Sequence, residues 1–397
     1  ARAPGGGLAF STRSPNHRMN GTARAMSAFP DRPLDFVAWL GTQTEDALVP
    51  RAAFGAYIAH HLRAACIPNG LIQFERTTVV DIIPENTQFL ITCSNGEHFR
   101  ARNLTLALGN YPADASIVPA AIRNHPNYLN DPWSIDPYRI DGDILCIGSG
   151  LTAMDACVTL WTSGFSHKIR LLSRHGLLPL LEDPHSKAVD YPALELDARS
   201  PFALLRSFRR AARAAAADGV DWRSLIEALR NPSPGIWQAW TLRDRKRFLR
   251  HLQAYWSVHR YRVPPQTAAI CYELMASGQL LRHRGIIKRA GTVGELMTIH
   301  TSDRGVMQAI ETRYVLNCTG PQSDYACNPD RLVQSLLRRG LIRGDALRLG
   351  IELLHPGMYS LGPPLRGAYY ESTAVPEIRA QALALARELA TKGVCAN

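Results

Sequence analysis

The middle of the chain has an apolar pattern that predicts a strand, a helix and a second strand in succession. "GDILCIGSG" (142–150) is an apolar run that ends in a glycine turn, and "LTAMDACVTLWTSG" (151–164) has apolar residues at helical spacing. "HKIRLLSRHG" (167–176) is a second short apolar run. Short apolar runs bounded by turn residues are typical of buried strands. The three segments together predict a βαβ unit.

Further strand and helix patterns lie on both sides of this unit. The strand patterns cover residues 77–83, 88–94, 98–109, 279–291, 295–303 and 306–320. The helical patterns cover residues 50–66, 200–219, 221–231, 243–265 and 378–393. The segment 183–265 is rich in Ala, Leu and Arg, which favours helices, and Asp221 and Thr241 are typical N-cap residues. Strands that alternate with helices predict an α/β fold.

The glycine turn after the central strand has the GxGxxA spacing of a dinucleotide site. Gly148 permits the tight turn, Gly150 lets the backbone approach the phosphates, and Ala153 lets the helix pack on the strand. Thr152 lies in the first helical turn, where a pyrophosphate would meet free N–H groups and the positive end of the helix dipole. The alternative is a tight turn that serves packing alone.

The end of the second strand indicates which nicotinamide coenzyme would bind. An NAD site places an acid there to accept a hydrogen bond from the ribose 2′-hydroxyl. This chain has Ser173, Arg174 and His175 instead, and a cation suits a 2′-phosphate. The pattern favours NADPH, although Arg174 would also fit a surface salt bridge.

Two strands end in the same way on either side of the dinucleotide segment. "LTLALGNYP" (104–112) and "YVLNCTGPQSDY" (314–325) are apolar runs that end in Gly109 and Gly320, each followed shortly by Pro. Proteins that bind two dinucleotides have such strands where the chain passes between domains. Either segment alone would fit an ordinary strand-to-turn junction.

The order of six segments resembles that of the bacterial FAD-NAD(P)-binding protein family, which lies near the flavin-dependent N-hydroxylating monooxygenases. The segments are "GGGLAFSTRSPNHRMNGTARAMSAFPD" (5–31), "PRAAFGAY" (50–57), "IGSGLTAMD" (147–155), "RFLRHLQAYWSVHRYRVPP" (247–265), "NCTGPQSDY" (317–325) and "LGPPLRGAYYESTAVPEIRAQA" (361–382). The resemblance implies an α/β fold with two Rossmann-like, three-layer dinucleotide-binding domains and a helical insertion in the second. It implies FAD and NADPH as cofactors and a small molecule as substrate.

The resemblance also implies domain boundaries. They are 1–135 for the first part of the FAD-binding domain, 136–182 and 266–311 for the NADP-binding domain, 183–265 for the helical insertion, and 312–397 for the return segment of the FAD-binding domain. Members of the family begin with a strand, a GxGxxG turn and a helix. This sequence starts just past that segment, so the resemblance predicts that it lacks the N-terminal unit with the FAD pyrophosphate turn.

Several residues are flavin contacts by their match to the family's segments. They are Gly6, Gly7, Ser11, Asn20, Met26, Gly109, Gly320, Gly362 and Thr373. The last of these would lie at the N-terminus of the final helix, where the dipole favours an anionic reduced flavin.

The exit of the helical segment, "HRYRVP", holds the candidate catalytic groups. Arg260 or Arg262 would clamp a substrate carboxylate or the coenzyme phosphates, and His259 would shuttle a proton. A structural salt bridge or a capping role is an equal alternative for each of them. No metal-binding motif accompanies these residues.

Composition narrows the class of protein. The net charge is +11, mostly from Arg, but the basic residues are scattered and no nucleic-acid motif accompanies them. Neither a signal peptide nor an apolar run long enough for a membrane helix is visible. The eight Cys include no CxxC pair, which predicts buried free thiols in a reducing cytoplasm. We expect no nucleic-acid partner and no membrane partner.

The sequence favours an FAD- and NADPH-dependent oxidoreductase, specifically a flavin monooxygenase acting on a small amine or a similar nucleophile. Two alternatives stay open. One is an NADPH-dependent flavin reductase or oxidase with a different electron acceptor. The other is a non-catalytic nucleotide-binding protein that serves as a redox sensor or a partner subunit.

Overall fold

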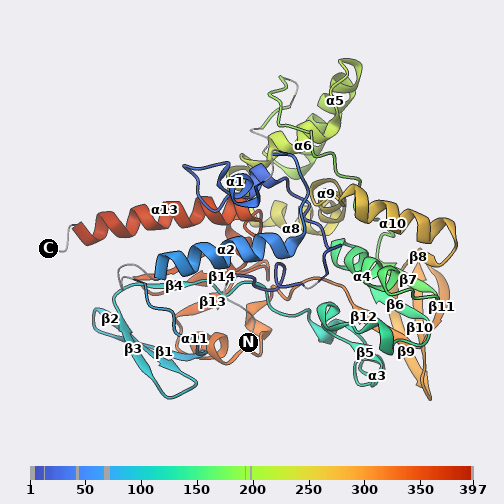
Figure 1. Ribbon diagram of the computed structural model, residues 1–397, viewed down its shortest axis with the longest axis horizontal. Helices are drawn as coiled ribbons and strands as arrows, with labels where there is room; N and C mark the ends of the chain where they lie inside the picture. Colours follow the sequence, from blue (N-terminus) through green and yellow to red (C-terminus); the bar gives the residue numbers. More distant parts are fainter. Residues whose placement is uncertain are drawn as a thin grey trace.

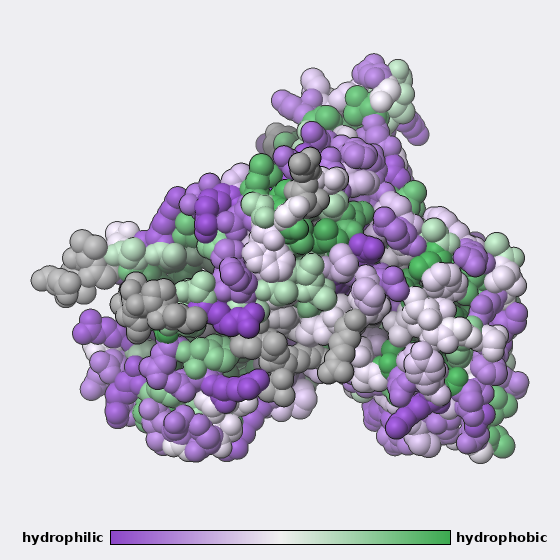
Figure 2. All heavy atoms as spheres, viewed as in Figure 1, coloured by the Kyte–Doolittle hydropathy of each residue, from purple (hydrophilic) through white to green (hydrophobic). Residues whose placement is uncertain are grey.

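The computed structural model describes residues 5–12, 14–41, 44–66, 72–192, 194–196 and 199–394. Two lobes with β-sheets lie side by side, and helices α5 and α6 project from the top (Figure 1). In the space-filling view, a notch divides the two lobes at the lower edge (Figure 2). No helix among the described residues is long and apolar enough to cross a bilayer.

The lobe that contains the GxGxxA turn is built on a five-stranded parallel sheet. Its strand order is β5 (Tyr128–Leu129), β12 (Tyr314–Asn317), β6 (Ile144–Ile147), β7 (Ile169–Ser173) and β8 (Leu280–Arg284). All four residues of β6 are buried, as expected for a parallel strand covered on both faces. This sheet confirms an α/β fold with a parallel sheet.

Alternate residues of the parallel sheet belong to two different cores. Ile144 and Cys146 face helices α4 (Leu151–Thr162) and α10 (Pro265–Ala276). Leu145 and Ile147 face the other way. There they meet α3 (Ala120–Arg123) and an antiparallel sheet of three strands. That sheet comprises β9 (Ile286–Val293), β10 (Leu296–Asp303) and β11 (Val306–Thr312). The period of two along β6 therefore builds a three-layer arrangement.

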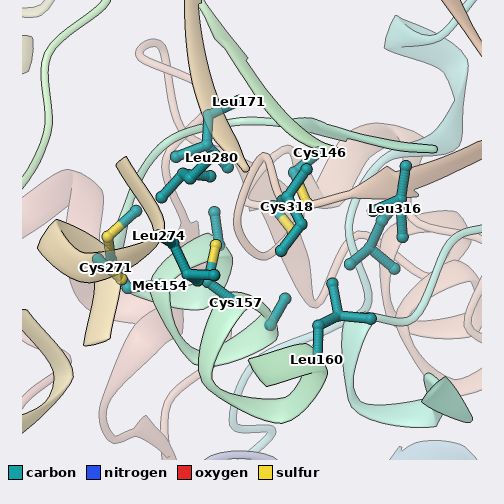
Figure 3. Close-up of a cluster of buried hydrophobic side chains, with 14 of the residues drawn as sticks. Cys146, Met154, Cys157, Leu160, Leu171, Cys271, Leu274, Leu280, Leu316 and Cys318 are labelled. Atoms are coloured by element: carbon teal, nitrogen blue, oxygen red, sulfur yellow. The ribbon is translucent and has the colours of Figure 1, made fainter. Parts of the chain in front are cut away.

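Four thiols lie in the core between the parallel sheet and its helices (Figure 3). The hydrogen bond from Cys271, together with burial, raises the pKa of Cys157 well above its ordinary value. Cys146 and burial do the same for the pKa of Cys318. Among the described cysteines none forms a disulfide, and the prediction of buried free thiols is confirmed for these four. Cys395 lies outside the described residues.

The other lobe combines the beginning and the end of the chain. Its strands are β1 (Val79–Glu85), β2 (Gln88–Cys93), β3 (His98–Ala101), β4 (Leu104–Leu106), β13 (Ile342–Gly344), β14 (Ile351–Leu353) and β15 (Met358–Ser360). The parallel pair of β4 and β15 joins segments that are far apart in sequence. The helices of this lobe are α1 (Asp35–Leu40), α2 (Arg51–Cys66), α11 (Arg331–Arg338), α12 (Arg366–Tyr369) and α13 (Val375–Val394).

Five helices lie between β7 and α10 in the sequence. They are α5 (Pro201–Ala217), α6 (Trp222–Arg230), α7 (Ser233–Ala239), α8 (Leu242–His251) and α9 (Gln253–Arg260). The two expected N-caps are observed, since Asp221 accepts from the Arg223 amide and Thr241 accepts from the Asp244 amide. Short 3-10 turns complete the structure at Ala23–Met26, Ala115–Ile117, Pro132–Ser134, Pro137–Arg139, Tyr325–Cys327 and Pro363–Leu365.

Two strands of the parallel sheet lie outside the residue ranges expected for the NADP-binding domain. The sequence interpretation assigns residues 312–397 to the return segment of the FAD-binding domain. In the structure, β12 pairs with β6 over four residues and forms part of the parallel sheet. The same sheet also includes β5, which lies before the expected start at 136. Both strands are short, and only their long-range pairing reveals where they belong.

Candidate functional site

A cavity of about 1090 Å³ lies where the two lobes and the helical segment meet. Its wall includes the N-terminal loop, the ends of the strands that lead to Gly109 and Gly320, and the first turn of α4. The helical segment contributes Glu227, Arg230 and Arg260, and α13 contributes its first turn. A space of this size is large enough for a sizeable ligand or two adjoining ones.

The glycine turn leads into the first turn of α4, which borders this cavity. Gly148 has a φ of +114°, and a Cβ placed there would lie 2.2 Å from the Cys318 carbonyl oxygen. Gly150 has no neighbour within 4 Å of such an atom. No side chain caps the N-terminus of α4, and Leu151 and Thr152 line the cavity. Gly148 therefore serves packing, while Gly150 leaves room for a ligand at a helix N-terminus.

The two strand-end segments lie next to each other. Tyr111 and Gln322 form an isolated antiparallel bridge, and the Gln322 amide donates to the Pro112 carbonyl at 3.1 Å. Gly109 and Gly320 both have positive φ and line the cavity, and a Cβ added to either would have no neighbour within 4 Å. The structure thus brings together two glycines that are more than two hundred residues apart, and each leaves the cavity wall free of a side chain.

Most of the expected flavin contacts border the same cavity. Gly6, Gly7, Asn20, Met26 and Thr373 line it. Ser11 is not a lining residue. Its hydroxyl donates to the Gly7 carbonyl at 2.6 Å and so stabilises the loop that lines the cavity. Gly362 lies next to a lining residue, Pro363, and its amide donates to Gln381 at 2.9 Å.

The end of β7 lies outside the cavity and is basic. Ser173 accepts from the Gly176 amide at 3.1 Å, so its hydroxyl is part of the turn. Arg174 is exposed, and His175 is half-buried. Burial lowers the pKa of His175, and the positive charges of Arg174 and Arg284 lower it further. Three basic groups from two neighbouring strands therefore gather at the place where a ribose 2′-phosphate would lie.

The three candidate catalytic residues have different environments. Arg262 lines the cavity, but its guanidinium contacts Glu182 at 2.9 Å, Glu227 at 2.7 Å and the His259 carbonyl at 3.1 Å. His259 is not among the lining residues, and its Nδ1 donates to the Tyr255 carbonyl of its own helix at 2.8 Å. The structure therefore does not bring His259 to the cavity, and Arg262 has a structural salt-bridge environment.

Arg260 is the candidate whose polar atoms are least engaged. Its side chain is 8% exposed, and it lies 3.8 Å from Glu371 and 3.6 Å from Glu377. Within the described part of the chain, neither Nε nor one of its terminal nitrogens has a hydrogen-bond partner. Since Arg260 lines the cavity, these buried donors are available to an anionic group that enters it.

The sequence reasoning missed the acidic partners of these arginines. Glu371 accepts from Trp256 at 2.8 Å and from Tyr261 at 3.1 Å, and Glu377 binds Arg230 through two contacts of 2.6 and 3.1 Å. These carboxylates follow the arginines by more than a hundred residues. No local spacing links the two groups.

Residues 1–111 match a family model described as FAD-NAD(P)-binding. The N-terminal part of the chain is therefore similar to an FAD-NAD(P)-binding domain. This match confirms the resemblance predicted from the sequence and supports FAD and a nicotinamide dinucleotide as its cofactors. No curated protein matches the sequence. Among the described residues, no group of three His, Cys, Asp or Glu side chains could hold a metal ion.

Solved structures resemble this chain over most of its length. L-lysine 6-monooxygenase from Pseudomonas syringae is 15% identical, with a TM-score of 0.59 over 94% of this chain and 87% of that one. The cadaverine monooxygenase of Erwinia amylovora, solved with FAD, is 12% identical, with a TM-score of 0.58 over 92% and 82%. Bacillithiol disulfide reductase from Staphylococcus aureus is 13% identical, with a TM-score of 0.52 over 94% and 84%. These likenesses show the fold.

Proposed function

We propose that the protein is an FAD- and NADPH-dependent oxidoreductase, and specifically a flavin monooxygenase that acts on a small amine or a similar nucleophile. The observation that carries the proposal is the shared cavity. Gly109, Gly320 and Thr373 border it from the expected flavin side, and Leu151 and Thr152 border it from the GxGxxA turn. Two of the structural relatives named above are monooxygenases of small amines, which supports the finer assignment.

The residues of the wall fit the two cofactors. Gly109 and Gly320 leave bare backbone against which a flat ring can lie. The uncapped first turn of α4 would bind a pyrophosphate, while Arg174 and Arg284 would attract a 2′-phosphate. A bound flavin supplies the electron transfer from the nicotinamide to the final acceptor. The protein's own part is to hold the two groups and to exclude water from the space between them.

The segment 183–265 acts in this proposal as a helical insertion of the NADP-binding domain that closes the cavity. Its last helix presents Arg260, whose unpaired donors would bind an anionic group of the substrate or of the coenzyme. Arg262 would hold Glu182 and Glu227 in place around that site. In this assignment Arg260 contacts the ligand and Arg262 supports the wall.

A second candidate is an NADPH-dependent reductase with another electron acceptor. The likeness to bacillithiol disulfide reductase favours it. Among the described residues that line the cavity none is a cysteine, so a disulfide acceptor would have to react without a thiol of this wall.

The experiment that tests the proposal uses the purified chain supplied with FAD. We expect a bound-flavin absorbance band, oxidation of NADPH in preference to NADH, and oxygen uptake that exceeds peroxide release when lysine, ornithine or cadaverine is added. The variant Arg174→Ala should raise the Michaelis constant for NADPH and leave that for NADH unchanged. Bound flavin that NADPH never reduces would contradict an enzyme function. Peroxide release equal to oxygen uptake with every amine would favour the second candidate.

A further inference from the structure

A buried ion pair connects the flavin-side lobe to the dinucleotide helix. Arg51 is the first residue of α2, and Asp155 lies in the second turn of α4. Arg51 Nη1 is 2.7 Å from Asp155 Oδ2, and the two side chains are 12% and 6% exposed. The charge of Arg51 favours the ionised carboxylate, whereas burial acts more strongly and raises the pKa of Asp155. Removing the partner of a buried carboxylate of this kind would destabilise the fold.

The guanidinium of Arg51 is held in one orientation by groups on three sides. Its Nε donates to the Arg18 carbonyl at 3.1 Å, and its Cζ lies 5.7 Å from the ring centre of Trp133. The Arg51 amide donates to the His17 carbonyl at 2.9 Å. An ion pair with fixed directions specifies a geometry, which an apolar contact of similar size would not do.

His17 makes a second connection between the same two segments. Its Nε2 lies 3.2 Å from the Asp155 carbonyl and 2.9 Å from the Thr159 hydroxyl, and its Nδ1 lies 2.7 Å from the Thr12 hydroxyl. Burial lowers the pKa of His17, so the ring is neutral and Nε2 donates to the carbonyl of the helix. His17 therefore ties the N-terminal loop to α4 at both Asp155 and Thr159.

The connection lies directly behind the ligand-facing part of the turn. Asp155 follows Leu151 by four residues and Thr152 by three, which places it one helical turn from the residues that line the cavity. Arg51 and Trp133 also line the cavity, on the side of the N-terminal loop. A shift of this pair would move the first turn of α4 relative to residues 14–26 of the N-terminal loop.

We propose that Arg51, acting through Asp155, is a positioning residue that sets the place of the nicotinamide coenzyme relative to the flavin. The inference rests on the proposed function, since it takes the first turn of α4 as the coenzyme site and residues 14–26 of the N-terminal loop as part of the flavin side. Arg51 need not bind either cofactor tightly. It fixes the distance across which the hydride passes, and small errors in such a distance slow the transfer.

The test compares Arg51→Met, Arg51→Lys and the control Asp143→Asn in the full chain loaded with FAD. Asp143 is a matched control because it pairs with Arg170 at 2.6 Å before β6, at the end of that strand opposite the turn. Stopped-flow mixing without oxygen gives both the dissociation constant of NADPH and the rate of flavin reduction at saturation. Hydrogen exchange on the cofactor-free protein reports on segments 14–19 and 151–159.

In R51M the reduction rate at saturating NADPH should fall about 10- to 100-fold, while flavin content and NADPH affinity stay close to wild type. R51K should recover part of the rate, and D143N should retain all of it. Exchange should accelerate in both segments in R51M alone. Should R51M fail to fold because Asp155 is left unpaired, the double variant R51M/D155N carries the same test.

A wild-type reduction rate in R51M would overturn the inference. So would a loss of flavin content and NADPH affinity that accounts for the whole decrease, because the pair would then be merely structural. If wild-type protein binds flavin that NADPH does not reduce, the proposed function fails instead. In that case the exchange data still decide whether Arg51 holds the two segments together. Exchange rates in R51M equal to those of wild type would show that it does not.

Discussion

The glycine turn before α4 and the charged wall at the exit of α9 border the same cavity but are built in opposite ways. The turn is made of backbone, and its parts lie within six residues, from Gly148 to Ala153. The charged wall is made of side chains that come from far apart, such as Arg260 and Glu371. The turn can tolerate almost no added atom at Gly148, whereas the wall keeps polar atoms of Arg260 without a hydrogen bond.

This difference indicates what each region does. A rigid turn suits a ligand part that is the same in every cycle, such as a pyrophosphate. Buried, incompletely satisfied charges are costly to the fold and are typical of a place where a ligand completes the interactions. Substitutions in the two regions should therefore separate stability from binding, and the predictions below run from the largest expected effect to the smallest.

The largest effect is expected from Gly148→Ala. The new Cβ would lie 2.2 Å from the carbonyl oxygen and 2.6 Å from the carbonyl carbon of Cys318, and a φ of +114° is unfavourable for alanine. Backbone atoms on both sides would have to move. We expect a loss of about 4 kcal/mol or more in the free energy of unfolding, measured by urea denaturation. A G148A variant within about 1 kcal/mol of wild type would show that the turn is not rigid.

The next largest effect concerns the charged wall, where Arg262→Met should lower the free energy of unfolding more than Arg260→Met does. Removal of Arg262 leaves the carboxylates of Glu182 and Glu227 without their shared partner, at a cost of about 3 kcal/mol. Arg260 is farther from its acids, and Glu377 keeps Arg230, so R260M should cost only about 1–2 kcal/mol. Denaturation of both variants checks the order. Equal costs would mean that Arg260 is as structural as Arg262.

The same comparison explains how far the sequence could predict the molecule. The βαβ unit and the GxGxxA turn are local patterns, and β6, α4 and β7 were predicted within a few residues of their observed bounds. The pairing of β12 with β6 is long-range, so no local pattern in the sequence could show that the two strands share a sheet. The pair Arg51–Asp155 spans more than a hundred residues without any periodicity, and only the fold reveals it.

The candidate site was predictable to the same extent. Glycines with a special conformation, such as Gly109 and Gly320, can be recognised because a strand that ends in Gly is a visible pattern. Arg260 and Arg262 are two residues apart in one motif, and their sequence context does not distinguish them. Their roles differ because α9 ends between them. Arg260, the last residue of the helix, lies near Glu371 and Glu377, whereas Arg262, past the helix end, contacts Glu182 and Glu227.

A smaller effect, on binding rather than folding, is expected from Gly150→Ala. Its φ of −83° suits alanine, and nothing lies within 4 Å of the added Cβ, so stability should stay within about 0.5 kcal/mol of wild type. The methyl group would occupy the space through which a pyrophosphate approaches the helix. We expect NADPH affinity to fall about tenfold, measured by fluorescence titration. Unchanged affinity would place the coenzyme away from this turn.

The smallest effect is a change in how stability depends on pH, and it tests the connection between loop and turn. The folded protein lowers the pKa of His17 from its ordinary value of 6.5, mainly through burial. As pH falls through 6.5, His17 becomes protonated in the unfolded chain while it stays neutral in the folded protein. The contribution of neutral His17 is therefore complete above that pH and is lost as pH falls toward the lowered value.

Denaturation from about pH 8 to about pH 6 should show stability decreasing more steeply in wild type than in His17→Gln. Because His175 and His283 also have lowered pKa values and are present in both proteins, the difference between the two slopes isolates His17. Identical slopes would mean that the pKa of His17 is the same in the folded and the unfolded chain, so that burial does not hold the ring neutral.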